Sequence, residues 1–388
     1  MSNTKIIDKE YVANTYKRFP VEIVSGKGSY VFDENGKKYI DMGSGIGVTS
    51  FGLCDDVWQE AVKEQLSKVQ HMSNLYYTQP CAELAELLCK KTGMKKVFFS
   101  NSGAESNECA IKVARKYAAD KKGAEYSTIV TLVNSFHGRT LTTLSAPGQE
   151  HYPELFQPLT PGFVHTPAND LKALEETVKN NKVAGIMMEI IQGEGGVLPL
   201  DAEFVKGAEK IAKENDIVLM IDEVQTGNGR TGELYAYMNY GINPDVVSTA
   251  KGIGGGLPLG ATMLSEKVEN VLGFGDHGST FGGNPVCCAG ALSITKRIDE
   301  KLLDEVKQKS AYVFSELQNA EGVESMCGLG LMIGIKPSKK AAGDVLNACM
   351  EKGVLCLTAK DKVRLLPALN IPMEALEEAV KVIKEALA

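Results

Sequence analysis

The chain has 388 residues, of which 44% are hydrophobic and 23% are charged, a composition typical of a soluble enzyme with two or three domains. Its formal net charge is −7 and no basic cluster is present, which excludes a nucleic-acid surface or an anionic-membrane surface as its main function. No apolar run is long enough to span a bilayer, so we expect a cytoplasmic protein. The nine cysteines include no C-x-x-C pair and no cysteine–histidine ligand spacing, so we expect small buried thiols and no metal site.

The first predicted element is a hairpin over residues 21–41 that turns at "ENGK", residues 34–37. Short apolar runs without polar alternation follow, and helices are predicted between them, among them 104–119 and 202–213. Such runs indicate strands buried on both sides, and therefore a mostly parallel sheet covered by helices on both faces. The predicted strands are residues 96–100, 127–133, 183–191, 217–224, 245–250 and 260–264.

The C-terminal part has a different pattern. Beyond Asn284 the sequence predicts two long helices, then short strands around 328–335 and 363–367, then a final helix. We expect an α/β fold with a large domain over 66–284 and a smaller α+β domain assembled from both termini, residues 1–65 and 285–388.

Lys251 lies between the apolar run that ends at Ala250 and the glycines of "KGIGGGLPLG". Most lysines are solvated surface residues. A lysine at the end of a buried strand can instead lose its proton, because desolvation disfavours the ammonium, and a neutral amine is a nucleophile. The glycines let the backbone approach a bulky ligand closely. Two interpretations therefore remain at this point, a carbonyl-trapping lysine or a phosphate loop.

Asp222 ends the apolar run "IVLMID", 29 residues before Lys251. A carboxylate in this position either caps a turn or meets a cation in a cleft. The carboxyl ends of strands are the ligand-binding edge of such sheets, so two candidate residues at strand ends favour the cleft. An aldehyde cofactor held on a lysine needs an acid opposite its ring nitrogen, which keeps that nitrogen protonated.

An anion site is predicted in "SNSGAESNECAIKVARKY", where a loop leads into a helix and free N–H groups and the helix dipole favour a phosphate. Ser102 could add its hydroxyl, or could simply cap the helix in a capping box with Glu105. In "NSFHGRT", Phe136 could stack on a flat cofactor and Arg139 could bind a carboxylate with two hydrogen bonds.

A different class of enzyme is suggested by "GNGRTG", residues 227–232, which matches G-x-G-x-x-G and would indicate a nicotinamide-dependent oxidoreductase. No convincing helix opens from this stretch, and the acidic residue expected about 20 positions later is missing. The glycines after Lys251 do not form a Walker loop either, because no GK[ST] follows them.

These motifs together resemble the fold-type I, class III pyridoxal-phosphate aminotransferases, and most closely their acetylornithine aminotransferase branch. The resemblance runs from residue 14 through "FFSNSGAESNECAIKVARKY", "SFHGRT", "IQGEGGV", "IDEVQTGNGRTG", "STAKG" and "HGSTFGGNP" to "VRLLP". Departures such as "GLCDD", "EII" and "LLPAL" lie beside the expected site and not among its chemical groups.

The resemblance implies pyridoxal 5′-phosphate as the cofactor. It makes Lys251 the Schiff-base lysine and Asp222 the partner of the pyridine nitrogen. The other implied cofactor contacts are Phe136 and Val224 on the two ring faces, Gln225 at the phenolic oxygen, Ser102, Gly103 and Ala104 at the phosphate, and Thr280 from the second subunit of a homodimer with shared active sites.

For the substrates, the resemblance implies that Arg139 binds the remote carboxylate, that Glu194 and Arg364 form a switchable ion pair, and that Tyr16 lies at the substrate mouth. A permanent structural salt bridge is the alternative for the ion pair. The implied reaction is the transamination of N-acetylornithine with 2-oxoglutarate, which gives N-acetylglutamate 5-semialdehyde and glutamate in arginine biosynthesis. Succinylornithine, ornithine and 4-aminobutyrate remain as alternative donors. Ile46 stands where ornithine aminotransferases usually have tyrosine, which favours an acylated donor.

Overall fold

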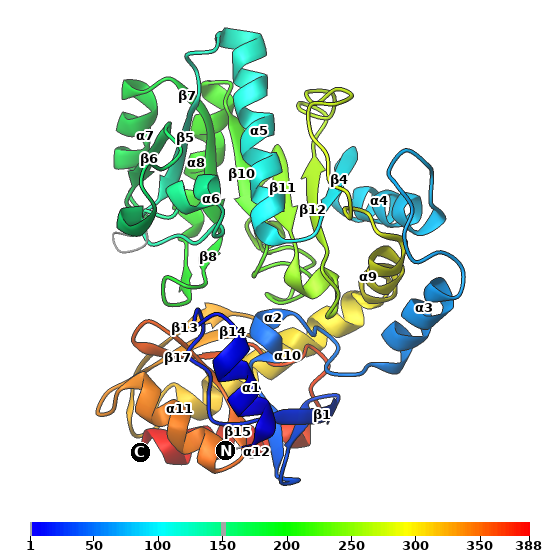
Figure 1. The fold of residues 1–388 in the computed structure, drawn as a ribbon. Helices are drawn as coiled ribbons and strands as arrows, with labels where there is room; N and C mark the ends of the chain where they lie inside the picture. Colours follow the sequence, from blue (N-terminus) through cyan, green and yellow to red (C-terminus); the bar gives the residue numbers. More distant parts are fainter. Residues whose placement is uncertain (1, 149–152) are drawn as a thin grey trace.

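The chain folds into two lobes, a larger one built on a seven-stranded sheet and a smaller one that holds both chain termini (Figure 1). A computed structural model describes residues 2–148 and 153–388. Within these residues, no helix is both long and apolar enough to cross a membrane.

The large sheet has the strand order β4-β12-β11-β10-β7-β5-β6. β12 runs antiparallel to both of its neighbours, and the remaining pairs are parallel, as the sequence predicted for most of the sheet. Its strands are β4 (Lys96–Ser100), β5 (Thr128–Leu132), β6 (Phe163–Thr166), β7 (Val183–Glu189), β10 (Val218–Asp222), β11 (Val246–Thr249) and β12 (Gly260–Leu264).

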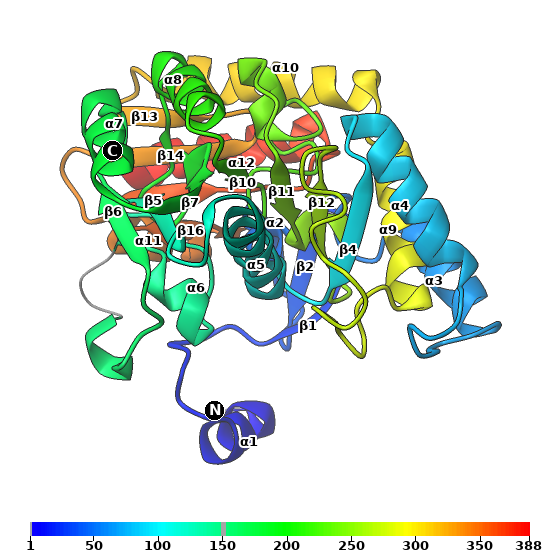
Figure 2. The same ribbon diagram turned by 90° about the horizontal axis from the view of Figure 1, so that it is seen from above.

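Helices cover both faces of this sheet (Figure 2). Met187 and Met220 face the buried side of α5 on one face, and Ile186 and Leu219 face α8 on the other. This arrangement explains why the strand sequences contain no polar alternation. The helices of this lobe are α4 (Gln79–Thr92), α5 (Gly103–Lys122), α6 (Leu141–Ser145), α7 (Leu171–Asn180), α8 (Ala202–Glu214) and the 3₁₀ segments η1 (Pro153–Phe156), η2 (Ala236–Tyr240) and η3 (Lys251–Ile253).

The smaller lobe joins the two ends of the chain in one sheet. Its first sheet has the order β1-β2-β3-β15, and β15 from the C-terminal part pairs in parallel with β3 from the N-terminal part. Its second sheet has the order β13-β14-β17-β16. The strands are β1 (Ile23–Lys27), β2 (Tyr30–Asp33), β3 (Lys38–Asp41), β13 (Val323–Leu329), β14 (Met332–Pro337), β15 (Val354–Leu355), β16 (Leu357–Ala359) and β17 (Lys362–Leu365).

The helices around the smaller lobe are α1 (Asn3–Tyr11), α2 (Ser44–Gly47), α10 (Glu300–Leu317), α11 (Ala342–Glu351) and α12 (Met373–Leu387). Of these, α10, α11 and α12 pack on its strands and on one another, whereas α2 contacts η3 of the larger lobe. α3 (Asp56–Leu66) packs with α4 against α9 (Pro285–Arg297), so these helices connect the two lobes. The exact domain boundaries, after residue 65 and after residue 284, stay a proposal.

Several details differ from the sequence predictions. The apolar run 183–191 is not one strand: β7 ends at Glu189, and β8 (Ile191–Gln192) pairs with β9 (Leu198–Pro199) in a separate small sheet. α1, β6 and α11 lie outside the predicted elements, and the predicted hairpin over 21–41 contains three strands, β1, β2 and β3, in place of two. The nine cysteines are free, but they are not all buried, because Cys54 is exposed and four others are only partly buried.

Candidate active site

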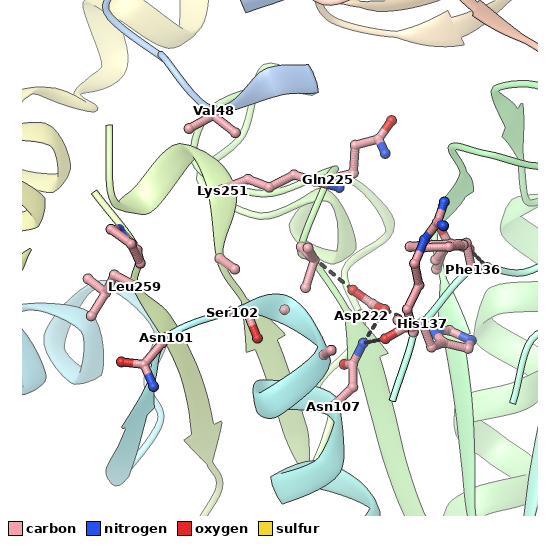
Figure 3. A pocket seen from close by; sticks show the side chains of 18 of the residues that line it. Val48, Asn101, Ser102, Asn107, Phe136, His137, Asp222, Gln225, Lys251 and Leu259 are labelled. Carbon is pink, nitrogen blue, oxygen red and sulfur yellow. Dashed lines mark hydrogen bonds and ion pairs between the residues drawn. The ribbon is translucent and has the colours of Figure 1, made fainter. Parts of the chain in front are cut away.

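The candidate site is a cavity of about 450 Å³ at the carboxyl ends of β10 and β11 (Figure 3). Nine of the thirteen residues predicted for the site line it. They are Ser102, Gly103, Ala104, Phe136, Arg139, Asp222, Val224, Gln225 and Lys251. The sequence prediction that ligand-binding residues gather at this edge of the sheet is therefore consistent with the fold.

Lys251 begins η3, two residues after β11 ends, and its side chain extends toward Gln225 (Figure 3). Its backbone has a φ of 49°, a left-handed conformation that is unusual for a residue other than glycine. Desolvation in the cavity lowers the pKa of Lys251 below its ordinary value, although the carboxylates of Glu194, Asp222 and Glu189 act in the opposite sense. The geometry thus favours a neutral, nucleophilic amine.

Asp222 is the last residue of β10, is only 3% exposed, and accepts hydrogen bonds at both carboxylate oxygens. Oδ2 accepts from Asn107 Nδ2 at 2.7 Å and from His137 Nδ1 at 2.8 Å. Oδ1 accepts from the Val224 amide at 2.9 Å. Ser248, which is opposite Asp222 on β11, fixes Asn107 by donating to its Oδ1 at 2.5 Å. Four segments of the chain therefore hold this carboxylate in one orientation.

Burial and the charge of Asp222 both shift the pKa values of His137 and Glu189. Burial alone would lower the pKa of His137, but the hydrogen bond and the charge of Asp222 raise it above its ordinary value, with Glu189 acting in the same sense. Glu189, opposite Asp222 on β7, is also buried, and desolvation raises its pKa to about 7. Its two oxygens accept from the amides of Phe136 at 2.8 Å and Gly193 at 3.2 Å. Glu189 therefore connects the loop after β5, which contains Phe136 and is called the Phe136 loop, to the loop after β8.

The N-terminus of α5 opens into the cavity (Figure 3). Ser102 is the N-cap: its Oγ accepts from the Glu105 amide at 3.2 Å and donates to the Glu105 carboxylate at 2.8 Å. Ser102 thus caps the helix, but the predicted capping box is not formed, because the Glu105 carboxylate accepts from the Asn101 amide at 3.0 Å and not from the Ser102 amide. A Cβ on Gly103 would come within 2.6 Å of Val224 Cγ1, so glycine is what allows the helix to start against Val224.

Glu194 and Arg364 lie beside this cavity. Arg364 Nη1 donates to Glu194 Oε1 at 2.6 Å and to Gln225 Oε1 at 3.1 Å. Burial alone would raise the pKa of Glu194, but Arg364 holds it below its ordinary value. Among the residues that the structure describes, Arg364 Nε is a buried donor without a partner.

Two predicted residues lie away from the cavity of their own chain. Tyr16 is 72% exposed and lines a neighbouring cleft of about 590 Å³, together with Ile46. Thr280 is exposed on the loop between β12 and α9. Neither residue lines the cavity that contains Lys251.

Sequence reasoning missed three polar groups of the site, Asn107, His137 and Glu189. Asn107 had a usable signal, because it lies one helical turn after Gly103 and so shares the face that meets the cavity. His137 and Glu189 had none, since their contacts with Asp222 and with the Phe136 loop depend on strand order.

Comparison with known proteins agrees with this geometry. The model of the class-III aminotransferase family matches residues 11–387. Acetylornithine aminotransferase of Haemophilus ducreyi is 48% identical over 99% of this chain and 98% of its own length. The enzyme of the same name from Methanocaldococcus jannaschii is 42% identical over 98% of this chain and 96% of its own length.

Solved structures are similar over nearly the whole chain. The ornithine aminotransferase of Toxoplasma gondii superimposes with a TM-score of 0.94 at 31% identity, covering 99% of this chain and 93% of that one. The acetylornithine aminotransferase of Elizabethkingia anophelis gives a TM-score of 0.88 at 30% identity, covering 99% and 98%. None of these relatives supports the nicotinamide oxidoreductase alternative, and in the described structure no α-helix opens from residues 227–232.

Proposed function

We propose a specific reaction for this chain, which belongs to the class-III aminotransferases. It transfers the δ-amino group of N-acetylornithine to 2-oxoglutarate, and the products are N-acetylglutamate 5-semialdehyde and glutamate. The observation that carries this proposal is the joint placement of a desolvated lysine, a fixed carboxylate and a helix N-terminus around one cavity. The proposed substrate is inferred from the names of the relatives, which are 39–48% identical over nearly the full chain.

The cavity fits pyridoxal 5′-phosphate. The free amides at the start of α5, at Gly103 and Ala104, suit the phosphate, and Ser102 already caps the helix. Phe136 and Val224 both line the cavity and suit the two faces of a flat ring, and Asp222 suits a protonated ring nitrogen. Gln225 also lines the cavity and is proposed to bond the phenolic oxygen. When bound, this cofactor supplies an aldehyde for the amino group and a ring that withdraws electrons.

The chain's own groups then move and hold protons. Desolvation lowers the pKa of Lys251, and its Nζ is proposed to accept a proton from the substrate carbon and return it to the neighbouring carbon. Asn107, His137 and the Val224 amide all donate to Asp222 and hold its carboxylate in one orientation, in which it suits a protonated ring nitrogen.

Two arginines suit the carboxylates of the substrates. Arg139 lines the cavity, with its guanidinium 5.9 Å from the centre of the Phe136 ring, and is proposed to bind the carboxylate distant from the reacting amine. Arg364 is proposed to bind the carboxylate next to the reacting carbon of 2-oxoglutarate and glutamate. N-acetylornithine has no carboxylate there, so Glu194 pairs with Arg364 in that half-reaction and swings aside in the other.

A homodimer with shared sites completes the proposal. Exposed apolar side chains gather on two loops that Asn74 joins through hydrogen bonds to the carbonyls of Ser279 and Gly282, both at 2.9 Å. Such a patch is typical of a protein interface. Thr280 lies in the same loop, and we propose that it reaches the phosphate of the partner subunit. The exposed residues of the patch are Leu75, Tyr76, Tyr77, Phe274 and Phe281.

A panel of amino donors tests the substrate. N-acetylornithine, N-succinylornithine, ornithine and 4-aminobutyrate are each assayed with 2-oxoglutarate, and kcat/KM is expected to be highest for N-acetylornithine. A higher kcat/KM for free ornithine or 4-aminobutyrate would contradict the proposed substrate. Borohydride reduction followed by peptide mapping tests the cofactor site, and a label on any residue other than Lys251 would contradict it.

A further inference from the structure

The loop between β8 and β9, residues 193–197, carries Glu194 and projects from the large lobe toward β13, β14 and β17 (Figure 1). Its backbone is strained, because Val197 has a φ of 55°, a left-handed conformation that is costly for a β-branched residue. At its start, the Gly193 amide donates to Glu189 Oε2 at 3.2 Å. The position of Glu194 therefore depends on what holds the far end of this loop.

Lys362 holds that far end. Its Nζ donates to the Gly196 carbonyl at 2.9 Å, and its other contact is Cys327 Sγ at 3.1 Å. The residue is only 9% exposed, and within residues 2–148 and 153–388 it forms no ion pair. Burying an ammonium without a carboxylate partner costs free energy of folding unless another acceptor is present, and here the Gly196 carbonyl is the oxygen acceptor.

The strand geometry explains why this lysine and Arg364 act on the same loop. They are two residues apart on β17, so their side chains leave the same face of the strand. Gly334 on the neighbouring strand β14 leaves room for the contact, since a Cβ there would lie 3.0 Å from Val197 Cβ and 3.3 Å from Lys362 Cδ. Strand β17 thus contacts both the backbone of the loop 193–197, through Lys362, and the Glu194 carboxylate, through Arg364.

We propose that Lys362 is a positioning residue for the donor switch, an inference that rests on the role proposed above for Glu194 and Arg364. Glu194 must leave Arg364 in one half-reaction and return to it in the other. If the Gly196 carbonyl is held, only the side chain of Glu194 has to rotate. Without Lys362, the strained backbone at residues 196–197 relaxes, and the Glu194 carboxylate loses its placement 2.6 Å from Arg364.

The test is Lys362→Met, which keeps an unbranched side chain one atom shorter than lysine and removes its charge and its donors. Single-turnover rates are measured with N-acetylornithine and with glutamate on enzyme loaded with cofactor. We expect the single-turnover rate to fall roughly tenfold with N-acetylornithine and to change by no more than about twofold with glutamate. The lost charged hydrogen bond affects only the half-reaction in which Glu194 pairs with Arg364. Lys336→Met is the matched control, because it removes a half-buried lysine of the same sheet that pairs with Glu324 at 2.8 Å and Asp361 at 3.7 Å and not with the loop.

Each outcome has a defined meaning. Equal losses with both donors, accompanied by a lower Tm, would show a merely structural lysine and overturn the inference, as would unchanged rates with both donors. Glu194→Ala is measured in parallel: if it discriminates between the donors and Lys362→Met does not, only the inference about Lys362 fails. If Glu194→Ala does not discriminate either, the donor switch itself is wrong. Should Lys362→Met not fold, Lys362→Gln retains a neutral donor and must show a smaller change of the same sign.

Discussion

Removal of Glu194 should separate the two half-reactions. Arg364 is 4% exposed and Glu194 is 33% exposed, so Glu194→Ala leaves a nearly buried guanidinium without its carboxylate. Breaking a fully buried pair costs about 3–5 kcal/mol. Because Glu194 is partly solvated and Gln225 Oε1 still accepts from Arg364 at 3.1 Å, we expect a smaller cost of about 2–3 kcal/mol. This corresponds to a roughly 30- to 150-fold lower kcat/KM for N-acetylornithine.

The assay follows the absorbance of the bound cofactor in a single turnover with each donor. Glutamate brings its own carboxylate to Arg364, so its half-reaction should be retained or faster in the variant. Glu194→Gln is the graded control, because its amide oxygen can still accept from Arg364 Nη1 but carries no charge. Equal losses with N-acetylornithine and glutamate would refute the reasoning and identify the contact as a permanent structural salt bridge.

Three further predictions follow from the same geometry. Asp222→Asn should retain the cofactor, as seen in its absorbance, and lose at least roughly a hundredfold in kcat, since the facing ring nitrogen is no longer held protonated; turnover like that of the wild type would remove Asp222 from the mechanism. Burial raises the pKa of Glu223 from 4.5 to about 7, so the folded state retains a proton that the unfolded state releases and stability falls as the pH rises from 4.5 to about 7. Glu223→Gln should therefore raise Tm relative to the wild type at pH 8 but not at pH 4. The corresponding difference in the free energy of unfolding is at most about 3 kcal/mol, and a Tm difference independent of pH would contradict this. Mixing Lys251→Ala chains with a Thr280 variant that binds cofactor poorly should restore activity through one intact site in each mixed dimer, and inactive mixed dimers would argue against shared sites.

Much of the fold class was determined by the sequence alone. Side chains such as Ile186 and Met187 are apolar on both faces of their strand, and only a sheet covered on both sides buries both. The same logic places Lys251 and Asp222, because a polar residue at the end of such a run must lie at the edge of the sheet. α11 escaped prediction because it is short and its N-cap, Ala341, has no side-chain hydrogen bond.

The contacts that tune these residues were decided only by the tertiary structure. Asn107 and Asp222 are separated by 115 residues and His137 and Asp222 by 85. They meet because α5 packs across β10 and because only β7 separates β10 from β5, the strand that precedes His137. Lys362 reaches Gly196 across 166 residues in the same way, through the packing of β17 against a loop of the other lobe. Periodicity and local motifs encode which face of an element is buried. Strand order and the packing of the two lobes depend on many weak contacts distant in sequence, so no local pattern could identify the partners of Asp222 or the anchor of the Glu194 loop.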